Sequence, residues 1–218
     1  MDIKRRTFAL GLGSAVAWPA LGGLTTAAYA QTPVKGGTIR IFLAEPTGLV
    51  SAISSAGPIA QISPKLFDGL VIYDTDMKMQ PRMAKSVDMS ADGKTLTIVL
   101  REGLKWHDGK PISSADVAFS ATKVWSKYHS RGRSTYASLT GVDTPNELTA
   151  VFNFSQPSAF VMNALFASEA QVVPKHIYDG TDILKNRANT APIGSGPYLV
   201  KGWRRNALHA QAVELFRR

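Results

Sequence analysis

The stretch between Val87 and Leu100 constrains the fold of this chain more than any other part of the sequence. Two extended runs of strand-forming residues, Val87–Met89 and Thr95–Leu100, are separated by Ser-Ala-Asp-Gly-Lys. An Asp-Gly pair between two such runs supplies the positive φ angles that a tight hairpin turn needs. The sequence therefore predicts an antiparallel β-hairpin that turns at Asp92-Gly93.

A helix is predicted shortly after this hairpin. A second turn signal occupies residues 106–109, with the sequence Trp-His-Asp-Gly, and Pro111 follows it. Ser113 can cap the N-terminus of the helix, and Asp116 can accept a hydrogen bond from the amide of the capping residue, as in a capping box. The apolar side of this helix is expected to carry Val117, Phe119, Val124 and Trp125.

Strands and helices are expected to follow one another irregularly in the rest of the chain. Strand patterns occur at residues 38–43, 70–73, 148–154 and 198–201, and helical patterns at residues 59–67, 158–167 and 174–178. Such an order favours an α/β fold of the mixed (α+β) kind.

The N-terminus has the three regions of an export signal. Lys4-Arg5-Arg6 is followed by a mildly apolar run from Phe8 to Trp18, and Ala28-Tyr29-Ala30 offers small residues for cleavage. The arginine pair is typical of the twin-arginine pathway, which predicts removal of residues 1–30 and delivery to the periplasm. A Sec-type signal and a membrane anchor are the alternatives, although the apolar run is shorter than the roughly 20 residues of a spanning helix.

The composition excludes several classes of function. The chain has no cysteine, so disulfides, thiolate metal sites, cysteine nucleophiles and lipid attachment are excluded. The formal net charge is +9, but the basic residues are scattered along the chain. The densest group lies between Lys123 and Arg133, and such a run is usually a solvated helix end. We therefore expect no nucleic-acid partner.

Candidate catalytic and metal sites are few. His107-Asp108 could serve as a general-base pair of a periplasmic hydrolase, but Ser113 and Ser114 are better explained as helix caps than as nucleophiles. The four histidines form no i,i+4 pair, and Asp74-Thr75-Asp76 lacks the oxygen ligand and the glycine that continue a calcium loop. We expect no catalytic residues, no metal and no cofactor.

A glycine pair near the C-terminus could suggest a nucleotide site. Gly194-Ser195-Gly196 precedes Pro197, which removes an amide that a phosphate-binding loop would use, and no Gly-Lys-Ser/Thr follows. We interpret this segment as a structural turn.

Several ordered motifs together resemble a known family. They are Ser90-x-Asp92-Gly93-Lys94, Leu100-Arg101, Lys105-Trp106-His107-Asp108-Gly109 and Asp116-Val117, with Leu66-Phe67-Asp68-Gly69-Leu70 and Met79-Gln80-Pro81 upstream and Val173-Pro174-Lys175-His176 and Pro192-Ile193-Gly194-Ser195-Gly196-Pro197-Tyr198 downstream. From about Gly37 to Trp203 the chain resembles the family-5 extracellular solute-binding proteins, which are peptide/nickel-type receptors of ABC importers.

This resemblance implies a fold and a set of boundaries. The fold would be an incomplete type II periplasmic-binding-protein lobe with the extra small domain of the family. Residues 1–30 would be the signal peptide and residues 31–205 the N-terminal part of the solute-binding domain. Residues 206–218 depart from the family pattern and are interpreted as a divergent tail, the result of truncation or of a frameshift.

The resemblance also implies a function. The chain would bind a peptide or a similar small solute as a monomer and pass it to an ABC permease of the inner membrane, without catalysis and without spanning the membrane itself. The ligand-binding residues implied are Glu45, Thr47, Ser54, Ser55 and Gly57, with Glu45 as a partner for a ligand amine or as a plain solvated carboxylate. A hydrolase that uses His107-Asp108 and a non-functional remnant are the alternatives.

Overall fold

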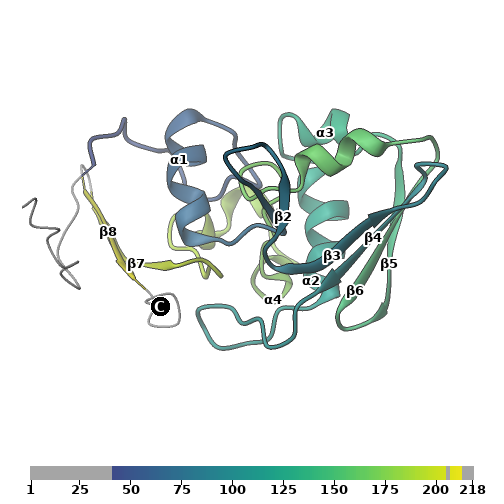
Figure 1. The fold of residues 1–218 in the computed structure, drawn as a ribbon. Coiled ribbons are helices and arrows are strands. Elements are labelled where there is room, and N and C mark those ends of the chain that lie inside the picture. Colours follow the sequence, from purple (N-terminus) through teal and green to yellow (C-terminus); the bar gives the residue numbers. More distant parts are fainter. Residues whose placement is uncertain (1–40, 205–206, 213–218) are drawn as a thin grey trace, which may run out of the picture. The chain divides into compact units, whose positions relative to one another are not determined.

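A four-stranded antiparallel sheet is the largest regular element of the computed structural model, which describes residues 41–204 and 207–212. From Phe42 onwards the described residues form one unit of the chain, which contains all of their helices and strands. The strands of the sheet are β3 (Ala84–Met89), β4 (Thr95–Leu100), β5 (Leu139–Asn146) and β6 (Thr149–Phe154), in the spatial order β3-β4-β6-β5 (Figure 1).

The predicted hairpin is confirmed as the pair β3-β4. Met89 lies opposite Leu96 and Val87 opposite Ile98 in the antiparallel register. At the turn Gly93 has a φ of +69°, a conformation that side-chain-bearing residues rarely adopt. The Asp-Gly signal therefore indicated the backbone geometry that the turn requires.

The predicted helix is confirmed as α2 (Ser114–Phe119), which continues into a π-helix, η1 (Ser120–Trp125). The Ser113 amide donates to Asp116 Oδ2 at 2.9 Å, which is the acidic half of the predicted capping box. Asp116 Oδ1 also accepts a hydrogen bond from the Lys175 amide at 2.8 Å. This buried carboxylate therefore links α2 to the short helix α4 (Lys175–Tyr178).

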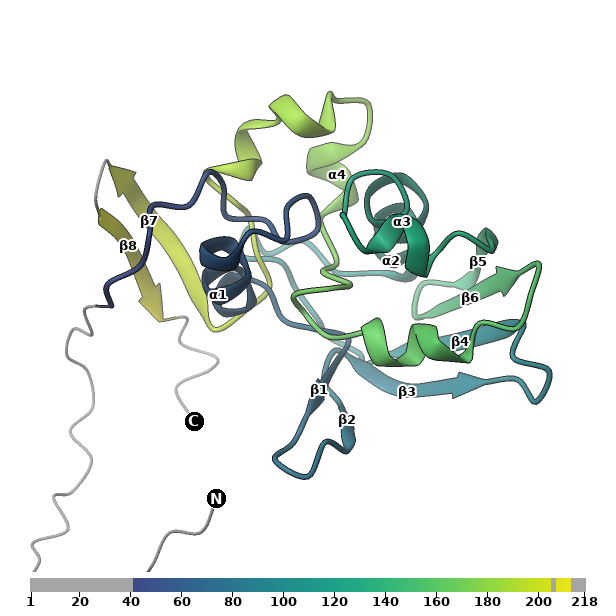
Figure 2. The ribbon, with the colours of Figure 1, turned by 90° about the horizontal axis from the view of Figure 1, so that it is seen from above.

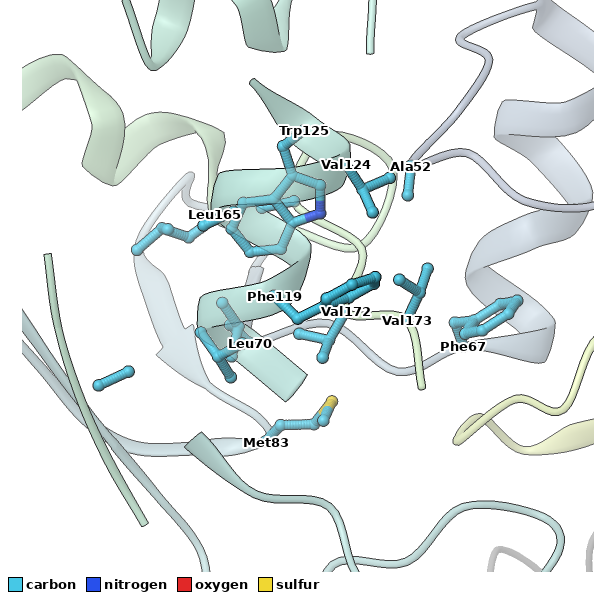
Figure 3. Packing of buried hydrophobic residues seen from close by; sticks show 14 of the residues in the cluster. Ala52, Phe67, Leu70, Met83, Phe119, Val124, Trp125, Leu165, Val172 and Val173 are labelled. Carbon is cyan, nitrogen blue, oxygen red and sulfur yellow. The ribbon is translucent and has the colours of Figure 1, made fainter. Parts of the chain in front are cut away.

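The core lies between the sheet and the helical segment of α2 and η1, which contacts β5 and β6 (Figures 1 and 2). Alternate residues of β4 and β6 are buried, as expected for a sheet with one face covered. Trp125 of η1 stacks on Phe152 of β6, with 6.5 Å between the ring centroids. Figure 3 shows Trp125 and Val124 packed with Leu165 and Val172, which follow the sheet in sequence.

The remaining elements are a helix, two strand pairs and several short helical turns. The helix is α1 (Gly57–Leu66), and the strand pairs are β1 (Val71–Tyr73) with β2 (Met79–Pro81) and β7 (Tyr198–Arg204) with β8 (Ala207–Ala212). The turns are α3 (Gly132–Thr135), η2 (Ala159–Ala164), η3 (Ile183–Lys185) and η4 (Arg187–Asn189).

Two predicted elements were wrong in part. Residues 41–43 of the predicted strand 38–43 have no regular structure, because no described strand pairs with them, and the side chains of Ile41 and Phe42 are exposed. The predicted helix 158–167 is instead the 3₁₀-helix η2, which is held by i→i+3 bonds such as Val161 amide to Ser158 carbonyl.

Some predictions lie partly or wholly outside the described residues. The export signal at residues 1–30 is among them. Within residues 206–218, the stretch Ala207–Ala212 forms β8 and pairs with β7. Among residues 41–204 and 207–212, no helix combines the length and the apolar character that crossing a membrane requires.

Candidate functional site

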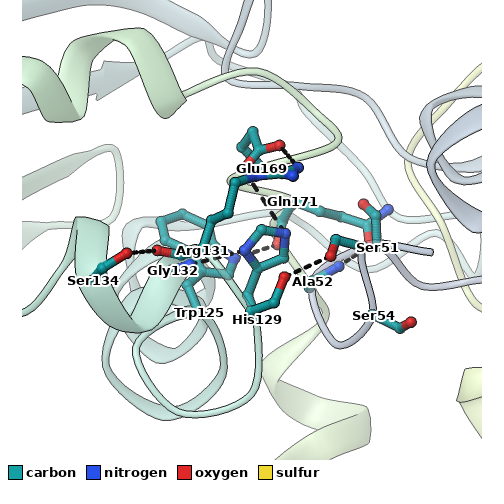
Figure 4. Close-up of polar contacts among 12 residues, drawn as sticks. Ser51, Ala52, Ser54, Trp125, His129, Arg131, Gly132, Ser134, Glu169 and Gln171 are labelled. Atoms are coloured by element: carbon teal, nitrogen blue, oxygen red, sulfur yellow. Dashed lines mark hydrogen bonds and ion pairs between the residues drawn. The ribbon is translucent and has the colours of Figure 1, made fainter. Parts of the chain in front are cut away.

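The loop that carries the predicted ligand residues, residues 45–57, is hydrogen-bonded to the buried side-chain amide of Gln171, which lies far from it in sequence (Figure 4). Gln171 Oε1 accepts a hydrogen bond from the Ala52 amide at 3.0 Å. Gln171 Nε2 donates to Ser63 Oγ of α1 at 2.6 Å. A single side chain therefore positions both the loop and the helix that follows it.

Two serines complete this buried network. The Ser51 amide donates to Ser63 Oγ at 3.0 Å, and Ser51 Oγ donates to the Ala167 carbonyl at 3.0 Å. Because Ser51, Ser63 and Gln171 are buried and hydrogen-bonded to one another, this network stabilises the conformation of the loop.

The structure brings two of the five predicted ligand residues together. Thr47 and Ser54 line one cavity of about 170 Å³. Its other lining residues come from the same loop, from α1 and from the segment of η3 and η4; they are Gly48, Val50, Ile53, Ile59, Leu184 and Asn189. None of the lining residues is charged.

The other three predicted residues lie elsewhere on the loop. Glu45 is exposed and does not line the cavity. Ser55 Oγ lies 2.5 Å from Ser130 Oγ. Gly57 is the first residue of α1, and a side chain there would meet open space. The structure therefore separates the predicted set into a cavity pair and three residues outside it.

A charged cluster lies close to Ser130. The Arg131 guanidinium donates to both carboxylate oxygens of Glu169. The buried His129 ring accepts from the Gly132 amide at Nδ1, and its Nε2 lies 4.0 Å from Glu169 Oε2. Burial lowers the pKa of His129, while the Glu169 carboxylate acts in the opposite direction.

A larger cavity of about 390 Å³ lies between α2 and α4. Six of its eight lining residues are polar or charged; the lining consists of Lys110, Pro111, Ser113, Ala115, Asp116, Lys175, His176 and Asp179. Asp116 is already bonded to α2 and α4, and His176 Nε2 lies 2.8 Å from Asp108 Oδ2. Asp116 is therefore engaged with α2 and α4, and His176 is engaged with Asp108, which does not line the cavity.

The candidate catalytic histidine has a structural role in the fold. His107 Nε2 lies 2.9 Å from the Gly196 carbonyl, and His107 Nδ1 accepts from the Gly194 amide at 3.3 Å. Because the Gly196 carbonyl can only accept, His107 Nε2 carries the proton. Both ring nitrogens are thus engaged, and the Asp108 carboxylate contacts His176 instead.

The interpretation of Gly194-Ser195-Gly196 as a structural turn is supported by close packing. The Ser195 and Gly196 amides both donate to the Leu66 carbonyl at the end of α1. A Cβ at Gly194 would lie 2.0 Å from that oxygen. Glycine is therefore required here for close approach of the backbone, and the amides are not free to bind phosphate.

Sequence reasoning missed Gln171, Leu184 and Asn189. Gln171 is separated from Ala52 by 119 positions, and no local pattern marks a contact of that range. Leu184 and Asn189 lie in short 3₁₀ turns or at their ends, which have no strong sequence signature.

Comparison with known proteins identifies one family for most of the described chain. Residues 78–213 match the family described as bacterial extracellular solute-binding proteins, family 5 Middle. A probable peptide ABC transporter periplasmic-binding protein of Sinorhizobium fredii, y4tO, is 28% identical over 201 residues, which are 91% of this chain and 36% of the relative.

Solved structures match the fold. The NikZ protein of Campylobacter jejuni in complex with Ni(L-His) gives a TM-score of 0.71 at 28% identity, over 79% of this chain and 34% of NikZ. The oligopeptide-binding protein AppA of Bacillus subtilis in complex with a nonapeptide gives a TM-score of 0.69 at 28% identity, over 78% of this chain and 35% of AppA. The chain thus spans about a third of the length of these proteins.

Proposed function

Because this chain belongs to the bacterial extracellular solute-binding proteins of family 5, we propose that it supplies the N-terminal part of the substrate-binding component of an ABC importer, with a peptide or a similar small solute as its ligand. The observation that carries this proposal is the match of about four fifths of the chain to proteins solved with a nonapeptide and with Ni(L-His). The ligand would bind on the face formed by the loop 45–57.

The loop has the properties expected of half of a binding cleft. Its backbone is hydrogen-bonded to the Gln171 side chain, and it presents hydroxyl groups at Thr47 and Ser54, while the Ser55 hydroxyl is hydrogen-bonded to Ser130. Small-molecule sites combine such polar groups with an apolar, largely preformed surface. Glu45 would pair with an amine of the ligand.

In this proposal the chain binds its solute and catalyses no reaction. The relatives are binding proteins, and both ring nitrogens of His107 are used in holding the turn 194–196. The partner would be an ABC permease of the inner membrane. The twin-arginine signal at residues 1–30 would deliver the chain to the periplasm as a monomer, and residues 206–218 would be a divergent tail.

Titration of the full chain with pools of short peptides, followed by calorimetry and by thermal unfolding, tests this proposal. We expect saturable heat and a rise in Tm, because a ligand that binds only the folded state stabilises it. A flat titration together with an unchanged Tm would show that this chain does not bind peptides. The hydrolase alternative predicts peptide cleavage that His107→Ala abolishes, which mass spectrometry of the same mixtures would detect.

A further inference from the structure

We propose that the cavity lined by Thr47, Val50, Ile53, Ser54, Ile59 and Leu184 is a subsite that accepts one aliphatic side chain of a bound peptide. This inference rests on the proposed function, because it assigns a substrate class to the face on which the loop 45–57 lies. It narrows the ligand from peptides in general to peptides that carry a leucine-like residue at one position.

The volume of the cavity suits a single side chain. Sites that enclose a whole small molecule have volumes of about 300–1,000 Å³, and this cavity has about 170 Å³. An apolar cavity of about 150 Å³ is known to hold a benzene-sized guest. The cavity is therefore too small for a whole peptide and large enough for one branched aliphatic group.

The lining favours an uncharged occupant, and its apolar part is formed by four of the eight lining residues, Val50, Ile53, Ile59 and Leu184. Val50 and Ile59 are almost fully buried, whereas Leu184 is 60% exposed at the edge of the cavity. A leucine side chain in the cavity would cover Leu184 and leave water, which is the source of hydrophobic stabilisation. A charged side chain would lose its hydration without gaining a partner of opposite charge, since no lining residue is charged.

The two sides of the cavity, formed by the loop 45–57 and by the segment of η3 and η4, are joined by hydrogen bonds within the chain. The Leu49 amide donates to the Asn189 carbonyl at 2.8 Å, which ties the loop to the segment that follows Leu184. The Asn189 side chain is itself fixed, because it accepts from the Tyr178 hydroxyl at 3.0 Å and donates to the Ile183 carbonyl at 2.8 Å. A preformed subsite loses little conformational entropy on binding.

The test compares the affinities of four peptides for the full chain by calorimetry. The probes are trialanine and the three tripeptides in which one alanine is replaced by leucine. We expect one leucine peptide to bind at least about tenfold more tightly than trialanine. A tenfold ratio corresponds to about 1.4 kcal/mol, which the burial of a leucine side chain can supply.

Two variants of cavity residues and one control variant test whether the preference for leucine arises in the cavity. Leu184→Asp places a charge at its edge and Ser54→Leu fills it, so each is expected to reduce the leucine preference to less than about threefold. Phe160→Asp is the matched control, since Phe160 is 54% exposed on η2 and does not line the cavity. Its preference should equal that of the wild type, and thermal unfolding of each variant establishes that it is folded.

Different results overturn the inference and the proposed function. Equal affinities for trialanine and for all three leucine peptides would overturn the inference alone. A leucine preference that survives in both Leu184→Asp and Ser54→Leu would do the same, because the side chain would then bind elsewhere. Absence of binding by all four tripeptides would overturn the inference, whereas the proposed function is tested separately by the titration with peptide pools.

Discussion

The Ala52 amide donates a hydrogen bond of 3.0 Å to the side-chain oxygen of Gln171, across 119 positions of sequence. Both residues are fully buried, so neither group can exchange its partner for water. The side-chain nitrogen of Gln171 donates a second hydrogen bond, to Ser63 Oγ of α1. The position of the loop 45–57 therefore depends on a side chain that lies far from it in sequence.

Replacement of Gln171 by methionine is expected to lower the free energy of unfolding by about 1–3 kcal/mol, because the buried Ala52 amide loses its acceptor. Urea unfolding followed by tryptophan fluorescence measures this change. Gln156→Met is the control, since Gln156 is exposed and exposed substitutions usually change stability by less than about 0.5 kcal/mol. Equal stabilities of the two variants would contradict the structural role of Gln171.

Gly194→Ala is expected to lower the free energy of unfolding by at least about 2–3 kcal/mol. The added methyl group would lie 2.0 Å from the Leu66 carbonyl oxygen and would separate the turn from the end of α1. Gly141→Ala on β5 provides the comparison, because a Cβ there meets nothing within 4 Å. It should be neutral or stabilising by up to about 1 kcal/mol, and a Gly194→Ala chain of equal stability would contradict the packing described.

The free energy of unfolding is expected to decrease as the pH falls below about 6.5. Burial lowers the pKa values of His107 and His129 in the folded chain. The unfolded chain therefore binds protons at a pH where the folded chain does not, and stability is lost as the pH falls towards the folded-state pKa values. Urea unfolding between pH 5.5 and 7.5 measures the slope. The slope should be smaller in His107→Gln, and equal slopes would show that this ring contributes nothing.

Local signals in the sequence predicted local structure well. The turn at Gly93 and the acidic cap at Asp116 were predicted because each depends on residues a few positions apart. The strand β5 was missed because it lies at an exposed edge and contains Gly141 and Pro145, which weaken the strand pattern. The π-helix η1 was missed because its spacing is close to that of an α-helix.

The candidate site could be predicted only in part, because it combines segments that are far apart in the sequence. Thr47 and Ser54 were found as loop residues, and the structure places them on one cavity. Leu184, on the opposite wall, is 130 positions from Ser54, and the pairing of the two segments is made by the backbone bond from Leu49 to Asn189. A backbone contact between distant segments leaves no pattern of residue types that a single sequence can show.

Glu45 provides a test of how the ligand is oriented. Its carboxylate is exposed at the start of the loop 45–57, so its attraction to a ligand amine is partly screened by water and is expected to change affinity by only about two- to fivefold. Glu45→Gln should weaken the binding of a tripeptide with a free N-terminus by that factor and leave its N-acetylated form unaffected. Calorimetry at low salt measures both affinities, because added salt weakens an exposed ion pair.

The control is Glu147→Gln, which removes another exposed carboxylate and should bind both peptides as the wild type does. If Glu45→Gln weakened the free and the acetylated peptide equally, the effect would come from the shape of the loop and not from charge, and Glu45 would be a solvated carboxylate beside the ligand.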